Sequence, residues 1–175
     1  MTEGFEDARS RRNWLERLGE MIPGFRGFQD RELRREVDKM QREHLAKELG
    51  RLKVVTRGKA RAYSDEGQIG VLHLFERLDR QLDGLSQAIR FSDYGASGFF
   101  DVVKINEPEL EKLYQFDLSV LDDVSLLSGD LAAIPLPGKG DAGEAVEQAL
   151  IRLGALEDKW AGRKSVVSEV VKASG

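Results

Sequence analysis

Apolar residues recur at intervals of three and four positions in several separate segments of this chain. In residues 71–91 the apolar positions are Phe75, Leu78, Leu82, Leu85 and Ile89. This spacing keeps one side of an α-helix apolar, because 3.6 residues complete a turn. Since the pattern returns in later segments, it predicts helices that pack against helices.

We expect four further helices. The first covers about 7–21 and ends before Pro23, which forces the preceding residue out of the helical region. A long helix follows Asp30, a candidate N-cap, and runs toward Tyr63. Its expected apolar face consists of Leu33, Val37, Met40, His44 or Leu45, Leu49 and Leu52.

Another helix opens at Glu107, where proline and acidic residues suit a first turn. Its stripe is Leu110, Leu113, Asp117, Val120, Val124, Leu127 and Leu131. The last helix runs from about Ala142 to Val171, and its spacing is also that of a coiled coil, which would allow it to pair with another chain. Its stripe is Val146, Ala149, Leu153, Leu156, Trp160, Val167 and Val170, with Arg163 on the same face.

The predicted fold class is therefore all-α, a bundle of about five helices that includes long, coiled-coil-like helices. No stretch resembles a long linker, so residues 1–175 are expected to form a single helical domain. Residues 134–140 combine proline and glycine, and this composition predicts a mobile loop before the C-terminal helix.

Composition narrows the possible chemistry. The chain has no cysteine, which excludes disulfides, thiolate zinc sites and cysteine nucleophiles. No apolar run approaches the roughly 20 residues that span a bilayer, and the N-terminus lacks the pattern of a secretory signal. These features predict a cytoplasmic location.

Charge is divided along the chain. Residues 1–62 contain 16 Lys and Arg against 11 Asp and Glu, a balance of +5, whereas residues 101–158 contain 4 against 13, a balance of −9. Segments of opposite sign can pair within a bundle or between subunits.

The strongest basic run lies in residues 51–61, which contain no acidic residue. Its cations are Arg51, Lys53, Arg57, Lys59 and Arg61. They could contact nucleic acid, an anionic membrane surface, or acidic segments of the same chain or of a second subunit. Phe25 and Phe28, which lie three apart among glycines, are candidate anchors for an interaction or for a loop on the protein's own core.

Asp117 interrupts an otherwise apolar stripe, so we expect it to be a buried polar residue with a structural role. A buried carboxylate is costly without a partner. The candidate partners are Arg90, Lys104, or an arginine among Arg31, Arg34 and Arg35.

No motif points to catalysis, a metal or a cofactor. His44 and His73 fall on different predicted helices, and neither has the spacing of a metal-ligand motif. The glycine segments 95–98 and 138–140 lack the Walker spacing and do not follow an apolar strand. We therefore expect no metal, no cofactor and no small-molecule substrate.

Three segments resemble an uncharacterised prokaryotic all-helical family. They are Ile22–Phe28 with Glu32–Lys39, then Ile89–Asp101, and Tyr114–Asp117. The similarity covers roughly residues 14–130 and leaves the C-terminal helix outside it. Because that family has no assigned activity, the resemblance implies no catalytic residue, and it favours structural or interaction roles for the turn aromatics and Asp117.

The sequence thus favours a non-enzymatic helical adaptor or scaffold that acts through helix-surface contacts with a protein partner and through self-association. The alternative is a peripheral membrane or nucleic-acid binding protein that uses residues 51–61. An enzyme is a third and less favoured interpretation.

Overall fold

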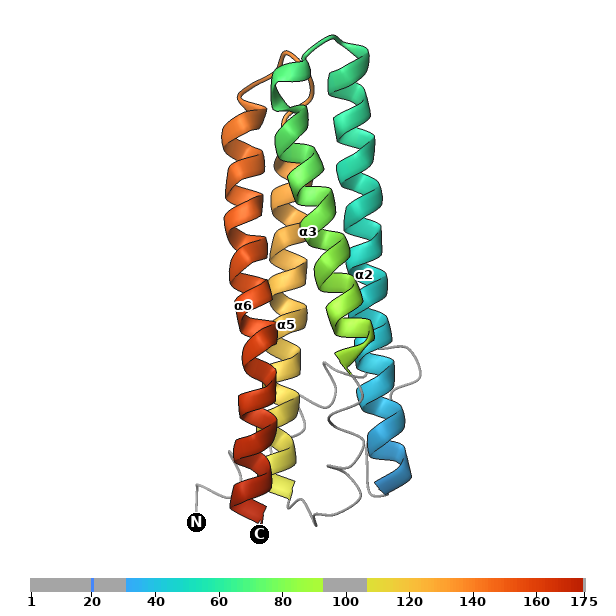
Figure 1. The fold of residues 1–175 in the computed structure, drawn as a ribbon, viewed down its shortest axis with the longest axis vertical. Coiled ribbons are helices and arrows are strands. Elements are labelled where there is room, and N and C mark those ends of the chain that lie inside the picture. The colour runs from blue at the N-terminus through green and yellow to red at the C-terminus, as the bar shows by residue number, and fades with distance from the viewer. Residues whose placement is uncertain (1–19, 21–30, 93–106, 175) are drawn as a thin grey trace. The chain divides into compact units, whose positions relative to one another are not determined.

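The computed structural model describes the backbone of Glu20 and of residues 31–92 and 107–174, and the side chains of Glu20 and of residues 38–92 and 112–169. Four long helices carry this part of the chain: α2 (Arg31–Asp65), α3 (Leu72–Arg90), α5 (Glu107–Ala133) and α6 (Ala142–Ser174). They pack as a bundle, and the described residues contain no strand (Figure 1). The predicted all-α class is confirmed, whereas the expected helix 7–21 lies, apart from Glu20, outside the described residues.

The chain divides into two compact units. The first comprises Met1–His44, Ser92–Ser119 and Gly162–Gly175, and the second comprises Leu45–Phe91 and Val120–Ala161. Whether residues 1–175 behave as a single domain stays a prediction. Among the described helices, no stretch is both long and apolar enough to cross a lipid bilayer.

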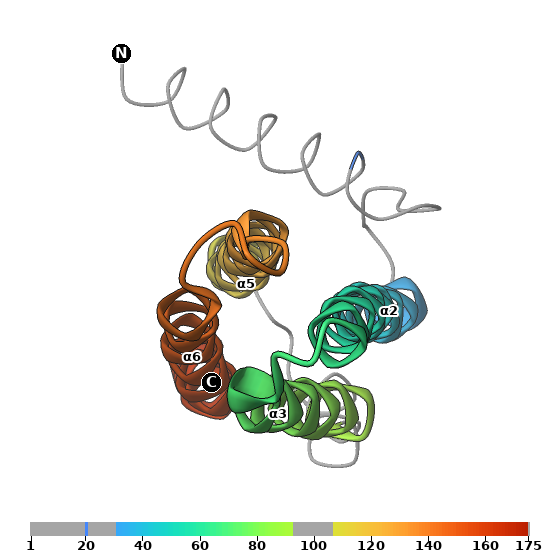
Figure 2. The same ribbon diagram turned by 90° about the horizontal axis from the view of Figure 1, so that it is seen from above.

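Within the second unit, parts of all four helices surround one apolar core. The stripe of α3 is buried as predicted: Phe75, Leu78, Leu82, Leu85 and Ile89. The stripes of α5 and α6 meet it with Val120, Val124, Leu127, Leu131, Val146, Ala149, Leu153 and Leu156, all buried. Figure 2 shows α2 and α6 at opposite corners of this unit, with α3 and α5 at the other two.

The helix ends in the second unit follow local rules. Asp141 caps α6, because its carboxylate accepts a hydrogen bond from the backbone NH of Glu144 at 3.2 Å. At the end of α2, Gly67 has a φ of +70°. The NH groups of Gly67 and Gln68 donate to the carbonyls of Ser64 and Tyr63, which is the Schellman pattern that favours glycine at this position.

The loop before α6 contacts α2. Ile134 is buried, and the Tyr63 hydroxyl donates a hydrogen bond to the Pro135 carbonyl at 2.8 Å. Pro137 and Gly138, with a φ of +74° at Gly138, form a turn closed by the Lys139 NH and the Leu136 carbonyl. The expected mobility of 134–140 stays a prediction.

The core of the second unit should dominate its stability. Leu82 is fully buried, so Leu82→Ala should lower the free energy of unfolding by about 2–5 kcal/mol through lost burial and a residual cavity. Leu126 on α5 is 53% exposed, so Leu126→Ala should change it by no more than about 0.5 kcal/mol. Chemical denaturation of the full chain checks both values. Similar losses in the two variants would contradict the observed packing.

Candidate functional site

The basic run 51–61 lies on α2 in the second unit, and each of its five cations has a partner in its own chain. Lys53 is paired with Asp83 of α3, and Arg57 binds both carboxylate oxygens of Asp79 at 2.7 and 3.0 Å. These pairs join α2 to α3. The sequence left open whether the run meets acidic groups of its own chain, and here four of the five cations do.

The remaining cations of the run have local or backbone partners. Lys59 donates to the carbonyl oxygens of Ile134 at 2.6 Å and Ala132 at 3.3 Å, at the end of α5. Arg51 pairs with Glu48 three residues earlier, and Arg61 approaches Asp65 at 3.7 Å. Because the Arg61 side chain is 84% exposed, water screens this last pair and it contributes little.

The pairs with α3 shift the pKa of one group in each pair. The hydrogen bond and charge of Asp79 raise the pKa of the Arg57 guanidinium above its ordinary value. The hydrogen bond and charge of Lys53 lower the pKa of the Asp83 carboxyl. Both shifts favour the charged forms of Arg57 and Asp83.

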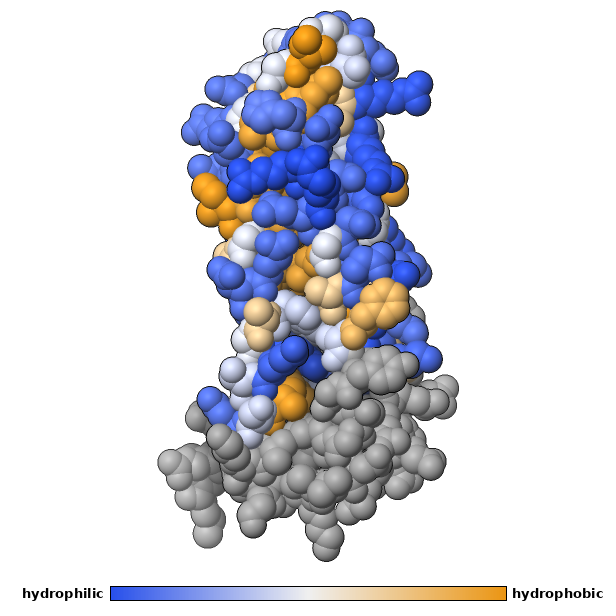
Figure 3. Space-filling model, in the orientation of Figure 1, coloured by the Kyte–Doolittle hydropathy of each residue, from blue (hydrophilic) through white to orange (hydrophobic). Residues whose placement is uncertain are grey.

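An apolar strip lies among the cations of α2. Val54 is 71% exposed and Val55 is 42% exposed, and a Cβ added at Gly58 would meet no atom within 4 Å. Figure 3 shows such orange, hydrophobic patches set among blue, hydrophilic side chains on one face of the molecule. The prediction for this run rested on its charges alone and did not include the exposed valines.

The other expected interaction residues, Phe25 and Phe28, lie outside the described residues, so their role stays a prediction.

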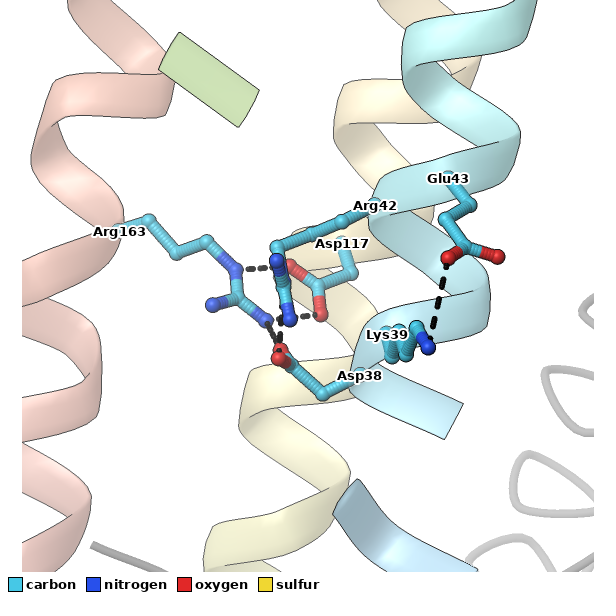
Figure 4. A network of polar contacts seen from close by, with 6 residues as sticks. All are labelled: Asp38, Lys39, Arg42, Glu43, Asp117 and Arg163. Atoms are coloured by element: carbon cyan, nitrogen blue, oxygen red, sulfur yellow. Dashed lines mark hydrogen bonds and ion pairs between the residues drawn. The ribbon is translucent and has the colours of Figure 1, made fainter. Parts of the chain in front are cut away.

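The first unit contains a buried network of four charged side chains. Arg163 of α6 reaches Asp117 of α5 and Asp38 of α2, while Arg42 of α2 binds the second oxygen of Asp38 (Figure 4). Arg163 holds Asp117 through two hydrogen bonds of 2.7 and 2.9 Å, and its bond to Asp38 is 2.7 Å. Along this network arginines and aspartates alternate, so the four side chains together carry no net charge.

Burial controls the titration of this network. Asp117 is only 2% exposed, and burial raises the pKa of its carboxyl, although the facing Arg163 opposes the shift. Burial acts to lower the pKa of the Arg163 guanidinium, but the carboxylates of Asp117 and Asp38 outweigh it and raise that pKa above its ordinary value. Arg163 therefore stays cationic inside the unit.

The partner of Asp117 differs from the candidates that the sequence suggested. They were Arg90, Lys104 and the arginines of 31–35, whereas the cation that binds Asp117 is Arg163. The signal was present in the sequence, since Arg163 falls on the apolar stripe of the last helix. A guanidinium on a buried stripe requires a carboxylate. Arg163 and Asp117 are 46 positions apart in the sequence, so no local pattern indicated that they pair.

The buried face of α2 also differs from the expected one in the first unit. Asp38, Gln41 and Arg42 are buried there, whereas Met40 and His44 are only half-buried. Of the predicted face, Leu45, Leu49 and Leu52 are buried as expected. The prediction is wrong at Met40, because Asp38, which is paired with Arg163, lies in the interior together with Gln41 and Arg42. The prediction for Leu33 and Val37 concerns side chains outside the described set.

Gln41 is the unsatisfied member of this interior. It is 2% exposed, and neither its amide nitrogen nor its amide oxygen has a hydrogen-bond partner in the part of the chain that the structure describes. A buried polar group without a partner lowers stability.

Two buried carboxylates and one histidine, side chains of kinds that serve in catalysis, have partners within the chain. Asp38 and Asp117 are both held by guanidinium groups, so neither is placed to take a proton from a substrate. Nδ1 of His73 lies 2.9 Å from the Gly70 carbonyl, a local contact. Within residues 38–92 and 112–169, no three histidine or carboxylate side chains gather as a metal site requires.

Removing Arg163 should be far more costly than removing an exposed arginine. Arg163→Met leaves Asp117 buried without its cation and should lower the free energy of unfolding by about 3–5 kcal/mol. The matched control is Arg152→Met, which removes a half-exposed pair with Asp130 and should cost at most about 1 kcal/mol. Denaturant titration measures both. Equal losses would show that the network is not buried.

Gln41→Met should leave stability unchanged or raise it, by up to about 2 kcal/mol, because methionine keeps the shape and removes two unpaired polar atoms. Gln41→Ala separates polarity from packing, since it leaves a void and should lower stability. Thermal and denaturant unfolding distinguish the variants. A clear loss in Gln41→Met would mean that the amide is bonded in solution.

No protein-family model matches the chain, and no match was found among curated proteins or solved structures. The resemblance to an all-helical prokaryotic family consequently stays a prediction.

Proposed function

We propose that this protein is a non-enzymatic helical adaptor or scaffold that acts through helix-surface contacts, including contacts between its own copies. The observation that carries the proposal is the exposed side of α2 in the second unit. We name this surface the α2 face. It consists of Lys47, Arg51, Val54, Val55, Gly58 and Arg61, all of which are exposed.

The composition of the α2 face favours a protein partner. Its centre is apolar and contains a glycine, and its ends are cationic. Protein-binding surfaces combine an apolar, closely packed centre with a polar rim. Val54 and Gly58 would allow a second helix to approach closely, and Lys47 and Arg61 would select a partner with acidic groups.

The alternative, binding to a membrane or to nucleic acid, depends on the cationic groups of residues 51–61 and not on the exposed valines. Lys53, Arg57 and Lys59 are directed to α3 and to the end of α5 by the pairs described above. Binding to phosphates would have to compete with these contacts, and the exposed valines would gain nothing from a nucleic-acid backbone. We therefore rank this alternative second.

An enzymatic role is less favoured again. Among the described residues, the buried carboxylates are bound to arginines, and Glu48 and Asp65 beside the exposed α2 cations are engaged in ion pairs. General acid–base chemistry needs such a group within hydrogen-bond reach of a substrate.

Photo-crosslinking tests the proposal. A benzophenone amino acid at Val54 should capture protein in cells, because the α2 face is a contact surface. Ile69 is the matched control, since it is also β-branched and 70% exposed but lies outside the α2 face. The expected result is a small set of protein adducts of defined mass from position 54 and few from position 69.

Equal labelling from both positions would contradict the proposal. Adducts with nucleic acid or lipid from position 54, together with salt-sensitive binding of the purified protein to DNA or anionic vesicles, would favour the alternative instead.

A further inference from the structure

A second exposed face in the same unit has chemistry opposite to that of the α2 face. We name it the α6 face, and it consists of Glu144, Gln148, Ile151, Ala155 and Asp158, all exposed. Its centre is apolar, because Ile151 is 66% exposed beside the small Ala155. Glu147, also exposed, adds a further negative charge.

The two cations of α6 within the second unit do not neutralise this face. Arg152 pairs with Asp130 and Lys159 pairs with Asp123, and both carboxylates belong to α5. Both cations are thereby directed toward the neighbouring helix. The outward side of α6 keeps its negative charge.

The two faces share one spacing. Lys47, Arg51, Val54, Gly58 and Arg61 follow each other at intervals of four, three, four and three residues, and so do the five residues of the α6 face. Placed side by side in the same direction, the pairs are Lys47 with Glu144, Arg51 with Gln148, Val54 with Ile151, Gly58 with Ala155 and Arg61 with Asp158. Each pair is complementary in charge, polarity or size.

These faces do not meet within one copy. In the second unit α2 is joined to α3 by ion pairs, α6 is joined to α5, and Figure 2 shows α2 and α6 at opposite corners. Among the described residues, neither face therefore meets its complement within the same copy.

We propose that the α2 face of one copy docks on the α6 face of a second copy, with the two helices parallel. This inference rests on the proposed function and names its partner. Because the two surfaces differ, the contact is heterologous and leaves one face open at each end of a pair, so further copies can add head to tail.

Small residues make the contact close. Gly58 has open space around it, and Ala155 on the facing helix is equally short, so the helix backbones can approach at this level. Val54 and Ile151 would then be shielded from water together. The exposed pair Arg61–Asp65 is long enough, at 3.7 Å, to exchange for a pair with Asp158.

Two charge-reversal variants test the inference. Lys47→Glu/Arg61→Glu alters only the α2 face, and Glu144→Lys/Asp158→Lys alters only the α6 face. All four positions are exposed, so both variants should keep the helical spectrum and the melting temperature of the native chain. Arg77→Glu/Arg80→Glu on the exposed side of α3 is the control for net charge.

Sedimentation velocity of the full chain at low salt gives the readout. The native chain and the α3 control should associate as concentration rises and should dissociate at high salt. Each α2-face or α6-face variant alone should need at least about tenfold more protein to associate, because like charges then face each other. An equimolar mixture of the two variants should associate again, since opposite charges face each other at every contact.

Several results would overturn the inference. They are a native chain that stays monomeric, variants that associate as the native chain does, or a mixture that stays monomeric. Association of the α6-face variant alone would indicate contacts between two α2 faces, which contradicts the inference but leaves the proposed function intact. Adducts from Val54 with other proteins only would have the same meaning.

Discussion

The structure of the described chain depends on the burial of one apolar stripe from each helix. A helix that turns a stripe such as Leu78, Leu82 and Leu85 into the core must turn its remaining sides outward or toward its neighbours. The stripe therefore also fixes which residues are exposed. In the second unit this constraint places Val54 on the surface of α2 and Ile151 on the surface of α6, and the two proposed faces follow from the same helical period as the core.

In the first unit the buried sides of the helices carry charged side chains. The interior positions of α2 there are polar, and α5 and α6 contribute Asp117 and Arg163 in place of apolar residues. Each charge is compensated by a neighbour of opposite sign, so the interior remains neutral. The intact charge network contributes little to the free energy of unfolding, because desolvation offsets most of the attraction between buried charges. Removing one of its members costs far more.

The sequence predicted the fold class and most of the core, because the stripes of α3, α5 and α6 are periodic over several turns. It failed on the first part of α2, where Asp38 is buried against Arg163 of α6 and lies beside the buried Gln41 and Arg42. It also missed Arg163 as the partner of Asp117, and it did not identify Asp79 and Asp83 as partners of the basic run. Such contacts join residues 22 to 125 positions apart, so no local pattern records them. The helical period of α2 would have predicted that Val54 and Val55 are exposed, but the prediction for this run considered only its cations.

In the proposed assembly, the α2 face of one copy meets the α6 face of another with the two helices parallel. The chain has no cysteine, so single cysteines can report this contact directly. A Gly58→Cys copy mixed with an Ala155→Cys copy should form a disulfide-linked pair, since a disulfide requires Cα atoms within about 7 Å. A Gly84→Cys copy, altered at an exposed glycine of α3, is the comparison. Gly58→Cys should link rapidly to Ala155→Cys and little to Gly84→Cys; equal linkage to both would show that the two faces do not meet.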